Sequence, residues 1–312
     1  MRRRQQKTKQ AHYCLLVNRQ AANYTLSHVK RLIHAIKKRR GAFTVLEPQS
    51  AMDTLKLAQM AAGVAKDGRA GLLQTRVRGK VTALVACGGD GTTNLVARAA
   101  VQADMPIGIL PLGLHNNIAR SLCGSDEPEA ALRKITKMGY RQIDTATVSG
   151  QMFFGSIGIG YFPELMALLD GVRPRFAFQW AKLGARIAAA IRPRKMIIKV
   201  DSFRFEVRPH MLQVNLLPYT ASLNLNPASI FDDNRAEIIF DVGADEKDLS
   251  EFARQLYKKK HLYGPTVRLF RGSAISFQPA MGQMLYLDGE LIELPTNVVE
   301  VKIGPAKLKV FC

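Results

Sequence analysis

The first 123 residues alternate between short apolar runs and amphipathic stretches, and this alternation limits the folds open to the chain more than any other feature. The apolar runs predict strands at 12–18, 43–48, 81–87 and 106–112, and the amphipathic stretches predict helices at 24–41, 51–66, 92–103 and 116–123. Strands that are apolar along nearly their whole length are typical of a parallel sheet covered on both faces. The sequence therefore predicts an α/β domain, with a parallel sheet flanked by helices.

The pattern changes near residue 141. From there most segments alternate polar and apolar residues and are joined by short turns, which is typical of an antiparallel sandwich. Two helices are predicted within this half, over 163–191 and 245–259. We therefore expect an α/β domain over 11–142 and a β-rich domain over 143–312, whose last strands can return to the first domain.

The segment 175–195 carries Phe176, Trp180, Leu183 and Ile187 on one face of a predicted helix, with Lys and Arg around them. Such a stripe can cover a sheet or lie on a membrane surface. Packing against the sheet is the simpler interpretation, because any surface helix shows an amphipathic stripe.

Charge is the most unusual feature of the composition. The 312 residues carry a net charge of +20, and Asp and Glu are absent before Glu47, within 171–200 and within 252–287. Such stretches attract polyanions, namely nucleotide phosphates, nucleic acid or an anionic membrane. Nucleic acid is not expected as a partner, because no known binding motif is present and few aromatic residues accompany the basic ones.

The composition also bears on the cellular setting. No apolar run approaches the length of about 20 residues that a membrane-spanning helix needs, and the basic N-terminus lacks the apolar core of a secretory signal. The four cysteines (Cys14, Cys87, Cys123 and Cys312) have no metal-type spacing. We expect a cytoplasmic protein without structural disulfides.

The segment 85–97, VACGGDGTTNLVA, ends a predicted strand in three glycines and an aspartate and then opens a predicted helix. Glycines allow successive backbone N–H groups to face an anion, and a helix N-terminus adds a favourable dipole. Ligands of α/β sheets bind beyond the carboxyl ends of the strands. The pattern predicts a phosphate site in which Asp90 holds Mg²⁺ or positions a nucleophile. A structural turn capped by Asp90 is the alternative.

A second acidic motif is MLYLDGELIEL, at 284–294. Asp288 and Gly289 stand between two apolar runs and predict a hairpin, whose turn can simply join two strands. A carboxylate next to a rigid turn can also accept the proton of an attacking hydroxyl, which suits phosphoryl transfer. Glu290, Asp288 and Asp90 are the candidate catalytic residues, and the residues alone leave open which one is the base.

Other catalytic signatures are absent from the sequence. It contains no G-x-x-x-x-G-K-[ST] loop, no protein-kinase set and no G-x-S-x-G elbow. The glycines of GSIGIG (155–160) are in the wrong order for a dinucleotide fingerprint. The six histidines show no metal-ligand spacing, and His115 is interpreted as loop variation.

Two motifs together resemble the diacylglycerol kinase catalytic domain family, especially its bacterial soluble lipid kinases. CGGDGTTN (87–94) is similar to the family's GGDGT-x-N signature, and ILPLGLHNNIAR (109–120) to its P-x-G-T-x-N-x-x-A-R signature. The resemblance continues in chain order through LLVN (15–18), VSGQMFFGSIGIGYFPEL (148–165), NPASIFDD (226–233) and LYLDGELIEL with the terminal strands.

The resemblance implies an α/β nucleotide-binding domain over 11–142 like that of NAD kinases, a β-rich lipid-substrate domain over 143–312 and an active site between them. It implies transfer of the γ-phosphoryl group of ATP to a lipid hydroxyl, with Mg²⁺ as cofactor and Glu290 as the proton acceptor. The residues implied at the nucleotide are Asn18, Gly88, Gly89, Asp90, Gly91, Thr92, Thr93, Asn94, Gly113 and Asn116. The family's metal-holding D-D-G segment corresponds to Asp232 and Asp233. The partners implied are a lipid and, through the basic patches, the inner face of an anionic membrane, and a homodimer is left open.

Four positions depart from the family's pattern. Leu114 replaces a Thr, NRQAA (18–22) replaces N-P-x-S-G, Leu95 stands where Glu is common, and DDNR (232–235) replaces D-D-G. These changes keep two other hypotheses open. One is a catalytically inactive regulator that binds lipid or nucleotide, and the other is a kinase for a soluble substrate such as NAD. The sequence does not name the lipid.

Overall fold

The computed structural model describes residues 10–64, 80–168, 176–220, 222–227, 229–242, 246–258, 260–279, 283–293 and 297–312. The chain divides into two compact units. Unit 1 comprises Met1–Leu114, Ser125–Arg141 and Leu308–Cys312, and unit 2 comprises His115–Gly124 and Gln142–Lys307. The segment 115–124 thus groups with unit 2, and the last five residues group with unit 1.

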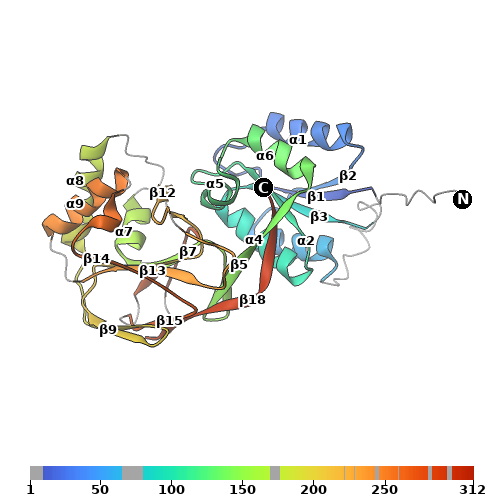
Figure 1. The fold of residues 1–312 in the computed structure, drawn as a ribbon. Coiled ribbons are helices and arrows are strands. Elements are labelled where there is room, and N and C mark those ends of the chain that lie inside the picture. Colours follow the sequence, from blue (N-terminus) through green and yellow to red (C-terminus); the bar gives the residue numbers. More distant parts are fainter. Residues whose placement is uncertain are drawn as a thin grey trace, which may run out of the picture. The chain divides into compact units, whose positions relative to one another are not determined.

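Unit 1 contains a parallel sheet with helices on both faces (Figure 1). In sheet order the strands are β2 (Ala42–Leu46), β1 (His12–Val17), β3 (Ala83–Gly88), β4 (Ile107–Pro111) and the end of β18 (Val299–Phe311). Helices α1 (Leu26–Lys38) and α6 (Pro128–Lys137) cover one face, and α2 (Ala51–Ala62) and α4 (Asp90–Gln102) cover the other. Strands β1, β3 and β4 are buried along their whole length, which explains their continuous apolar sequences.

Capping side chains set the ends of the first helices. Thr25 accepts the backbone N–H of His28 at the start of α1, and Ser50 accepts that of Asp53, 3.1 Å away, at the start of α2. Helix α2 is followed by Gly63, whose φ of 78° is left-handed. The predicted helix over 51–66 therefore ends at Ala62, because a left-handed residue stops it.

Unit 2 contains two antiparallel sheets. One holds β9 (Phe203–Val207), β8 (Met196–Val200), β15 (Ala274–Phe277) and β18, with β5 (Tyr140–Val148) paired to β18 and to β6 (Gln151–Phe153). The other holds β14 (Val267–Gly272), β13 (Ala236–Asp241), β10 (Met211–Asn215), β7 (Ser156–Gly160), β16 (Met284–Leu287) and β17 (Glu290–Glu293). A separate small pair is formed by β11 (Tyr219–Thr220) and β12 (Leu223–Asn224).

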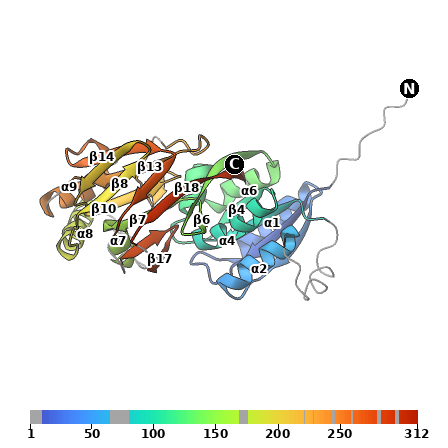
Figure 2. The ribbon, with the colours of Figure 1, turned by 90° about the horizontal axis from the view of Figure 1, so that it is seen from below.

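The two sheets of unit 2 pack into a sandwich with a layer of helices on one side (Figures 1 and 2). Ile157 and Val214 of one sheet and Ile198 and Phe277 of the other belong to one buried core. Alternate residues such as Met211 point the other way and pack under the helices. These helices are α7 (Tyr161–Leu168), α8 (Ala177–Ala190), α9 (Glu246–Tyr257) and the 3₁₀ helix η1 (His261–Tyr263), and α5 (Asn117–Cys123) also belongs to unit 2.

The predicted fold class is confirmed: an α/β region with a parallel sheet is joined to an antiparallel β-rich region. Two details differ from the sequence prediction. The segment 163–191 contains two helices, α7 and α8, and residues 169–175 between them lie outside the described residues. Helix α6 was not predicted, although Pro128 at its first turn is a recognised start signal. Within the described part of the chain, no helix is both long and apolar enough to cross a membrane.

Acid is expected to destabilise unit 2 through His261, which is 1% exposed. Its Nε2 lies 2.7 Å from the carbonyl oxygen of Leu225, and its Nδ1 has no hydrogen-bond partner among the described residues. Burial lowers the pKa of His261 below its ordinary value of 6.5. The unfolded chain therefore takes up the proton at a higher pH than the folded protein does. The free energy of unfolding should be fully retained above pH 6.5 and fall below it, by up to about 1.4 kcal/mol per pH unit for this one group.

Urea unfolding between about pH 7.5 and about pH 5.5 measures this dependence. His261→Gln should lower stability at neutral pH but reduce the slope with pH. Burial also lowers the pKa of His12 in unit 1, so part of the slope should remain. An unaltered slope in His261→Gln would contradict the assignment.

Candidate functional site

The glycine-rich loop lies at the carboxyl end of β3, where Gly88 ends the strand and Gly89 caps helix α4. A Cβ on Gly88 would lie 2.5 Å from Thr92 Oγ1, and a Cβ on Gly89 would lie 3.1 Å from the Cα of Gly113. Both glycines are therefore required by close approach, one to the first turn of α4 and the other to the loop after β4. Asp90 is the first residue of the helix.

Three loops of unit 1 meet at this point. Asn18, after β1, donates from Nδ2 to Thr92 Oγ1 at 3.1 Å and from its backbone N–H to the carbonyl of Cys87. Asn23 donates from Nδ2 to the carbonyl oxygen of Gly113 at 2.6 Å. The sheet thus gathers predicted residues from three separate motifs at one edge. Thr92, Thr93 and Asn94 are buried there, whereas Gly89, Asp90 and Gly91 are partly exposed.

The loop NRQAA (18–22) lacks the glycine of the family's pattern, and the side chain of Asn18 stabilises the loop instead. Asn18 Oδ1 accepts the backbone N–H of Gln20 at 2.9 Å, which is an Asx turn. Asn18 therefore closes the NRQAA loop with one end of its amide and contacts Thr92 with the other. This departure from the family's pattern leaves the loop ordered around the same Asn.

Asn116, the last predicted nucleotide residue, groups with unit 2 and has a left-handed φ of 50°. Its neighbours hold a second segment of that unit. Asn117 Oδ1 accepts the N–H of Ser222 at 2.8 Å, and His115 Nδ1 lies 2.8 Å from Ser222 Oγ. His115 is therefore a structural contact and not loop variation, and no local signal in the sequence indicated this.

Asp288 holds the turn of the Asp-Gly-Glu hairpin. Its φ of 47° and that of Gly289, 108°, are both left-handed, as hairpin turns of this length require. The carboxylate of Asp288 accepts three backbone N–H groups, from Phe154, Gly155 and Ser156, each at 2.8 Å. Both of its oxygens are occupied and the residue is 8% exposed, so it fits a structural role better than that of a base.

Glu290 has a different environment from Asp288. It is exposed at the start of β17, and its carboxylate has no hydrogen-bond partner in the described part of unit 2. A carboxylate in this setting can accept a proton from a ligand. Of the two acids at the turn, Asp288 and Glu290, Glu290 is the one that the geometry leaves available.

The segment 232–235, in which Asp232 and Asp233 are predicted to hold a metal, contacts basic side chains of the chain itself. Asp144 has a fully buried side chain and forms an ion pair with Lys307, whose Nζ also donates to Asn234 Oδ1 at 2.7 Å. Asp233 forms an ion pair with Arg271, which also lies 3.3 Å from Glu237.

These contacts bear on the metal prediction for Asp232 and Asp233. Asp232 is exposed and Asp233 already has a guanidinium partner. No group of three or more His, Cys, Asp or Glu side chains that could hold a metal is found among the described residues. The residues of this turn therefore do not fit a divalent cation, and we derive no chemistry from one there.

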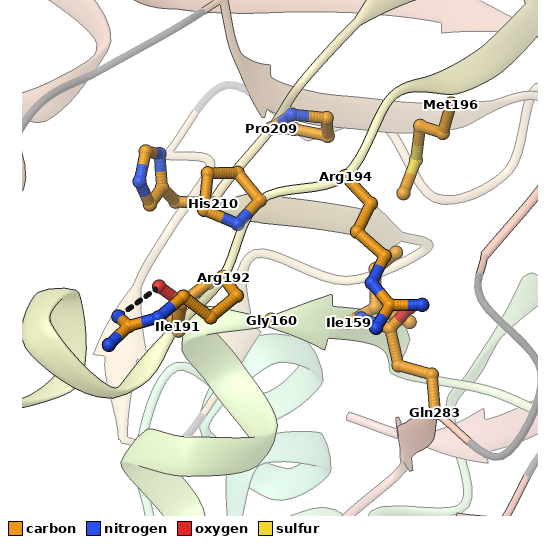
Figure 3. A pocket seen from close by; sticks show the side chains of 10 residues that line it. Ile159, Gly160, Ile191, Arg192, Arg194, Met196, Pro209, His210 and Gln283 are labelled. Carbon is orange, nitrogen blue, oxygen red and sulfur yellow. Dashed lines mark hydrogen bonds between the residues drawn. The ribbon is translucent and has the colours of Figure 1, made fainter.

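A cavity of about 280 Å³ lies at the other end of β7 from Ser156 (Figure 3). Its lining combines apolar groups such as Ile159 and Met196 with Arg192, Arg194 and His210. The two arginine side chains point apart (Figure 3), and Arg192 donates to the carbonyl oxygen of Ala189 at 2.8 Å. They do not converge on a common ligand.

Substituting Gly89 tests the close packing of the glycine loop. We expect Gly89→Ala to weaken the predicted nucleotide binding by at least about tenfold, because its Cβ would push the loop away from the backbone of Gly113 by a few tenths of an ångström. Gly139→Ala is the control, since a Cβ there meets nothing within 4 Å and the backbone is not left-handed. Isothermal titration with an ATP analogue measures both variants, and equal affinities would contradict the expectation.

Comparison with known proteins supports the motif assignments. Residues 12–148 match the model of the diacylglycerol kinase catalytic domain. The "Probable lipid kinase YegS-like" protein of Pseudomonas fluorescens is 37% identical over 98 residues, which are 31% of this chain and 32% of that protein. The matched region thus spans about a third of the length of this curated relative.

Solved structures extend the similarity to the whole fold. A diacylglycerol kinase from Bacillus anthracis aligns with a TM-score of 0.70 at 17% identity over 98% of both chains. An NAD kinase from Archaeoglobus fulgidus in complex with ATP aligns with a TM-score of 0.51 at 13% identity over 96% of this chain and 93% of that one. At such identities the likeness shows the fold alone. Residues 12–148 are thus similar to the diacylglycerol kinase catalytic domain, and the solved structures extend the likeness in fold to the rest of the chain.

Proposed function

We propose that this protein is a lipid kinase that transfers the γ-phosphoryl group of ATP to a lipid hydroxyl at an anionic membrane surface. The observation that carries the proposal is the meeting of three loops around Gly88–Thr92, within the segment that matches a kinase domain family. The lipid kinase name of the curated relative and the ATP bound by the structurally related NAD kinase agree with it.

The phosphates of ATP would rest on the first turn of α4. This helix has 13 residues and no side-chain cap at Gly89, and the dipole at a helix N-terminus favours an anion. Asn18, Gly113 and Asn116 are proposed as further nucleotide contacts, with Gly91, Thr93 and Asn94 supporting the turn. Asp90 is the residue that would hold the Mg²⁺ accompanying ATP, and this ion would neutralise charge on the phosphates.

Glu290 is proposed as the general base. It would take the proton of the lipid hydroxyl as the new oxygen–phosphorus bond forms and the bond between the γ-phosphorus and the bridging oxygen breaks, releasing ADP. Asp288 would keep Glu290 in place through its three backbone contacts. Phosphoryl transfer depends mainly on positioning and charge neutralisation. A single carboxylate held in position is therefore enough to accept the proton.

The basic surface supports the membrane part of the proposal. With a net charge of +20, the protein would be drawn to the anionic inner face of a membrane, by about 1 kcal/mol for each basic side chain that lies close to it. We propose that the protein works in the cytoplasm, peripherally bound to that face.

ADP release from Mg-ATP, measured with lipids in mixed micelles, tests the function. The panel is diacylglycerol, phosphatidylglycerol, ceramide and a sphingoid base, and triacylglycerol is the matched control because it lacks a free hydroxyl. Turnover with one of the four lipids, absent with triacylglycerol and lost in Asp90→Ala, is the expected result. Turnover only with NAD would replace the lipid with a soluble substrate. Nucleotide binding without ADP formation would indicate an inactive regulator.

A further inference from the structure

Two phenylalanines are exposed side by side at the start of α8. Phe176 is 58% exposed and Phe178 is 68% exposed. Their rings stack with centroids 5.8 Å apart and planes at 11°. Single apolar residues on a surface are ordinary, but a contiguous exposed aromatic pair indicates a contact surface.

The exposed aromatic pair continues into a basic stripe. Phe178, Lys182 and Arg186 follow at intervals of four residues, so they lie on one face of the helix, and all three are exposed. Residues 171–200 contain no Asp or Glu, so no acid of this segment offsets the charge. We call Phe176, Phe178, Lys182 and Arg186 the α8 face.

The opposite side of α8 is already occupied. Leu183 and Ile187 pack into a core that includes Phe252 and Leu256 of α9, and the two helices lie side by side (Figures 1 and 2). This corrects the predicted single stripe, because Phe176 is exposed whereas Leu183 and Ile187 pack in the core. The side chain of Trp180 lies outside the described residues. The α8 face is therefore not needed to anchor the helix.

We propose that the α8 face docks on the surface of an anionic lipid bilayer, with the two phenylalanine rings at the level of the lipid head groups and the Lys and Arg side chains among the phosphates. Aromatic rings next to basic residues are typical of helices that lie in this interface. A protein partner fits less well, because the cores of protein interfaces are depleted in Lys. The inference rests on the proposed function for the biological role of docking. The docking itself needs neither ATP nor catalysis and can be tested without them.

Co-sedimentation with vesicles, in the absence of nucleotide, tests the docking. Wild type should bind vesicles that contain phosphatidylglycerol, and bind pure phosphatidylcholine much less. Lys182→Gln with Arg186→Gln should weaken binding about tenfold or more, and Phe176→Ser with Phe178→Ser should weaken it several-fold. Raising the salt from about 0.1 M to about 1 M shortens the Debye length from about 10 Å to about 3 Å and should release wild type.

The matched control removes the same charge elsewhere. Lys30 and Lys38 are exposed on α1 of unit 1, with no aromatic pair beside them, and Lys30→Gln with Lys38→Gln should weaken binding no more than two- to threefold. An equal loss in this control would overturn the proposal, because binding would then follow net charge and not the α8 face. Failure of the wild-type protein to bind anionic vesicles would also overturn the proposal. Circular dichroism verifies folding, and Phe178→Ser alone serves if a double variant is unstable.

Docking and catalysis can fail separately in this design. Glu290→Gln should sediment with vesicles as wild type does, whatever its kinase activity. If wild type docks through the α8 face but forms no ADP with any lipid, the docking surface stands and the kinase proposal falls. If ADP forms with a lipid in detergent micelles while the vesicle assay shows no role for the α8 face, the reverse holds.

Discussion

Glu290→Gln is expected to lower lipid-dependent ADP formation by about 10²- to 10⁴-fold and to leave the melting temperature unchanged. This range is the usual contribution of a positioned general base. The melting temperature should not move because the Glu290 side chain is exposed and has no described hydrogen-bond partner whose loss would cost stability. Steady-state ADP release and thermal unfolding, measured on the same preparation, give both quantities.

Whereas Glu290→Gln should affect mainly ADP formation, Asp288→Asn should affect mainly the melting temperature. Its side chain would present an amide N–H₂ to one or more of the three backbone N–H groups that the carboxylate now accepts. A buried donor without its acceptor costs about 1–3 kcal/mol. We expect a lower melting temperature, with any loss of activity following from the loosened turn. If Asp288→Asn is stable but inactive while Glu290→Gln is active, the roles of the two acids are reversed.

Lys307→Met is expected to destabilise the folded protein by about 3–5 kcal/mol. The variant leaves the carboxylate of Asp144, whose side chain is fully buried, without its ammonium partner. Removing one member of a buried ion pair has this cost because the remaining charge is uncompensated. Lys309→Met is the matched control on the same strand. Lys309 pairs with Asp104, which is 79% exposed, so its loss should cost no more than about 1 kcal/mol.

Urea unfolding of three proteins distinguishes this charge effect from lost packing. Lys307→Met combined with Asp144→Leu should recover much of the stability, because no buried charge then remains alone. Equal costs for Lys307→Met and Lys309→Met would contradict the buried-pair assignment. Removal of divalent cations with EDTA should leave wild type unaffected, since the described acids Asp144 and Asp233 have cationic partners within the chain.

Periodicity predicted the fold class because it is a local property of the sequence. The apolar strands of unit 1 and the alternating strands of unit 2 each reflect which faces of a sheet are buried. The grouping of elements into units was less accessible. The association of α5 with unit 2 depends on contacts such as Asn117 with Ser222, 105 residues apart, and no local pattern encodes such a pairing.

The sequence predicted which residues belong to the candidate site, but not which role each of its acids has. Asp288 and Glu290 are equivalent acids in the sequence, and only the structure brings the backbone of Phe154, 134 residues away, to the carboxylate of Asp288. Lys307 and Arg271 likewise carried no signal of their contacts with Asp144 and Asp233. A sequence shows that the family's metal motif is substituted. It does not show that basic side chains from distant strands, Lys307 and Arg271, form ion pairs with Asp144 and Asp233.

Strand β18 has a consequence for the order in which this protein is made. Its last residues pair with β4 through Val310 and Ile107, and Leu308, Val310 and Phe311 are buried in unit 1. Strands β1 to β4 of that sheet precede the strands of unit 2 in the chain, yet β18, which lies beside β4, is translated after them. On the ribosome, the sheet of unit 1 can therefore be completed only after most of unit 2 has been translated.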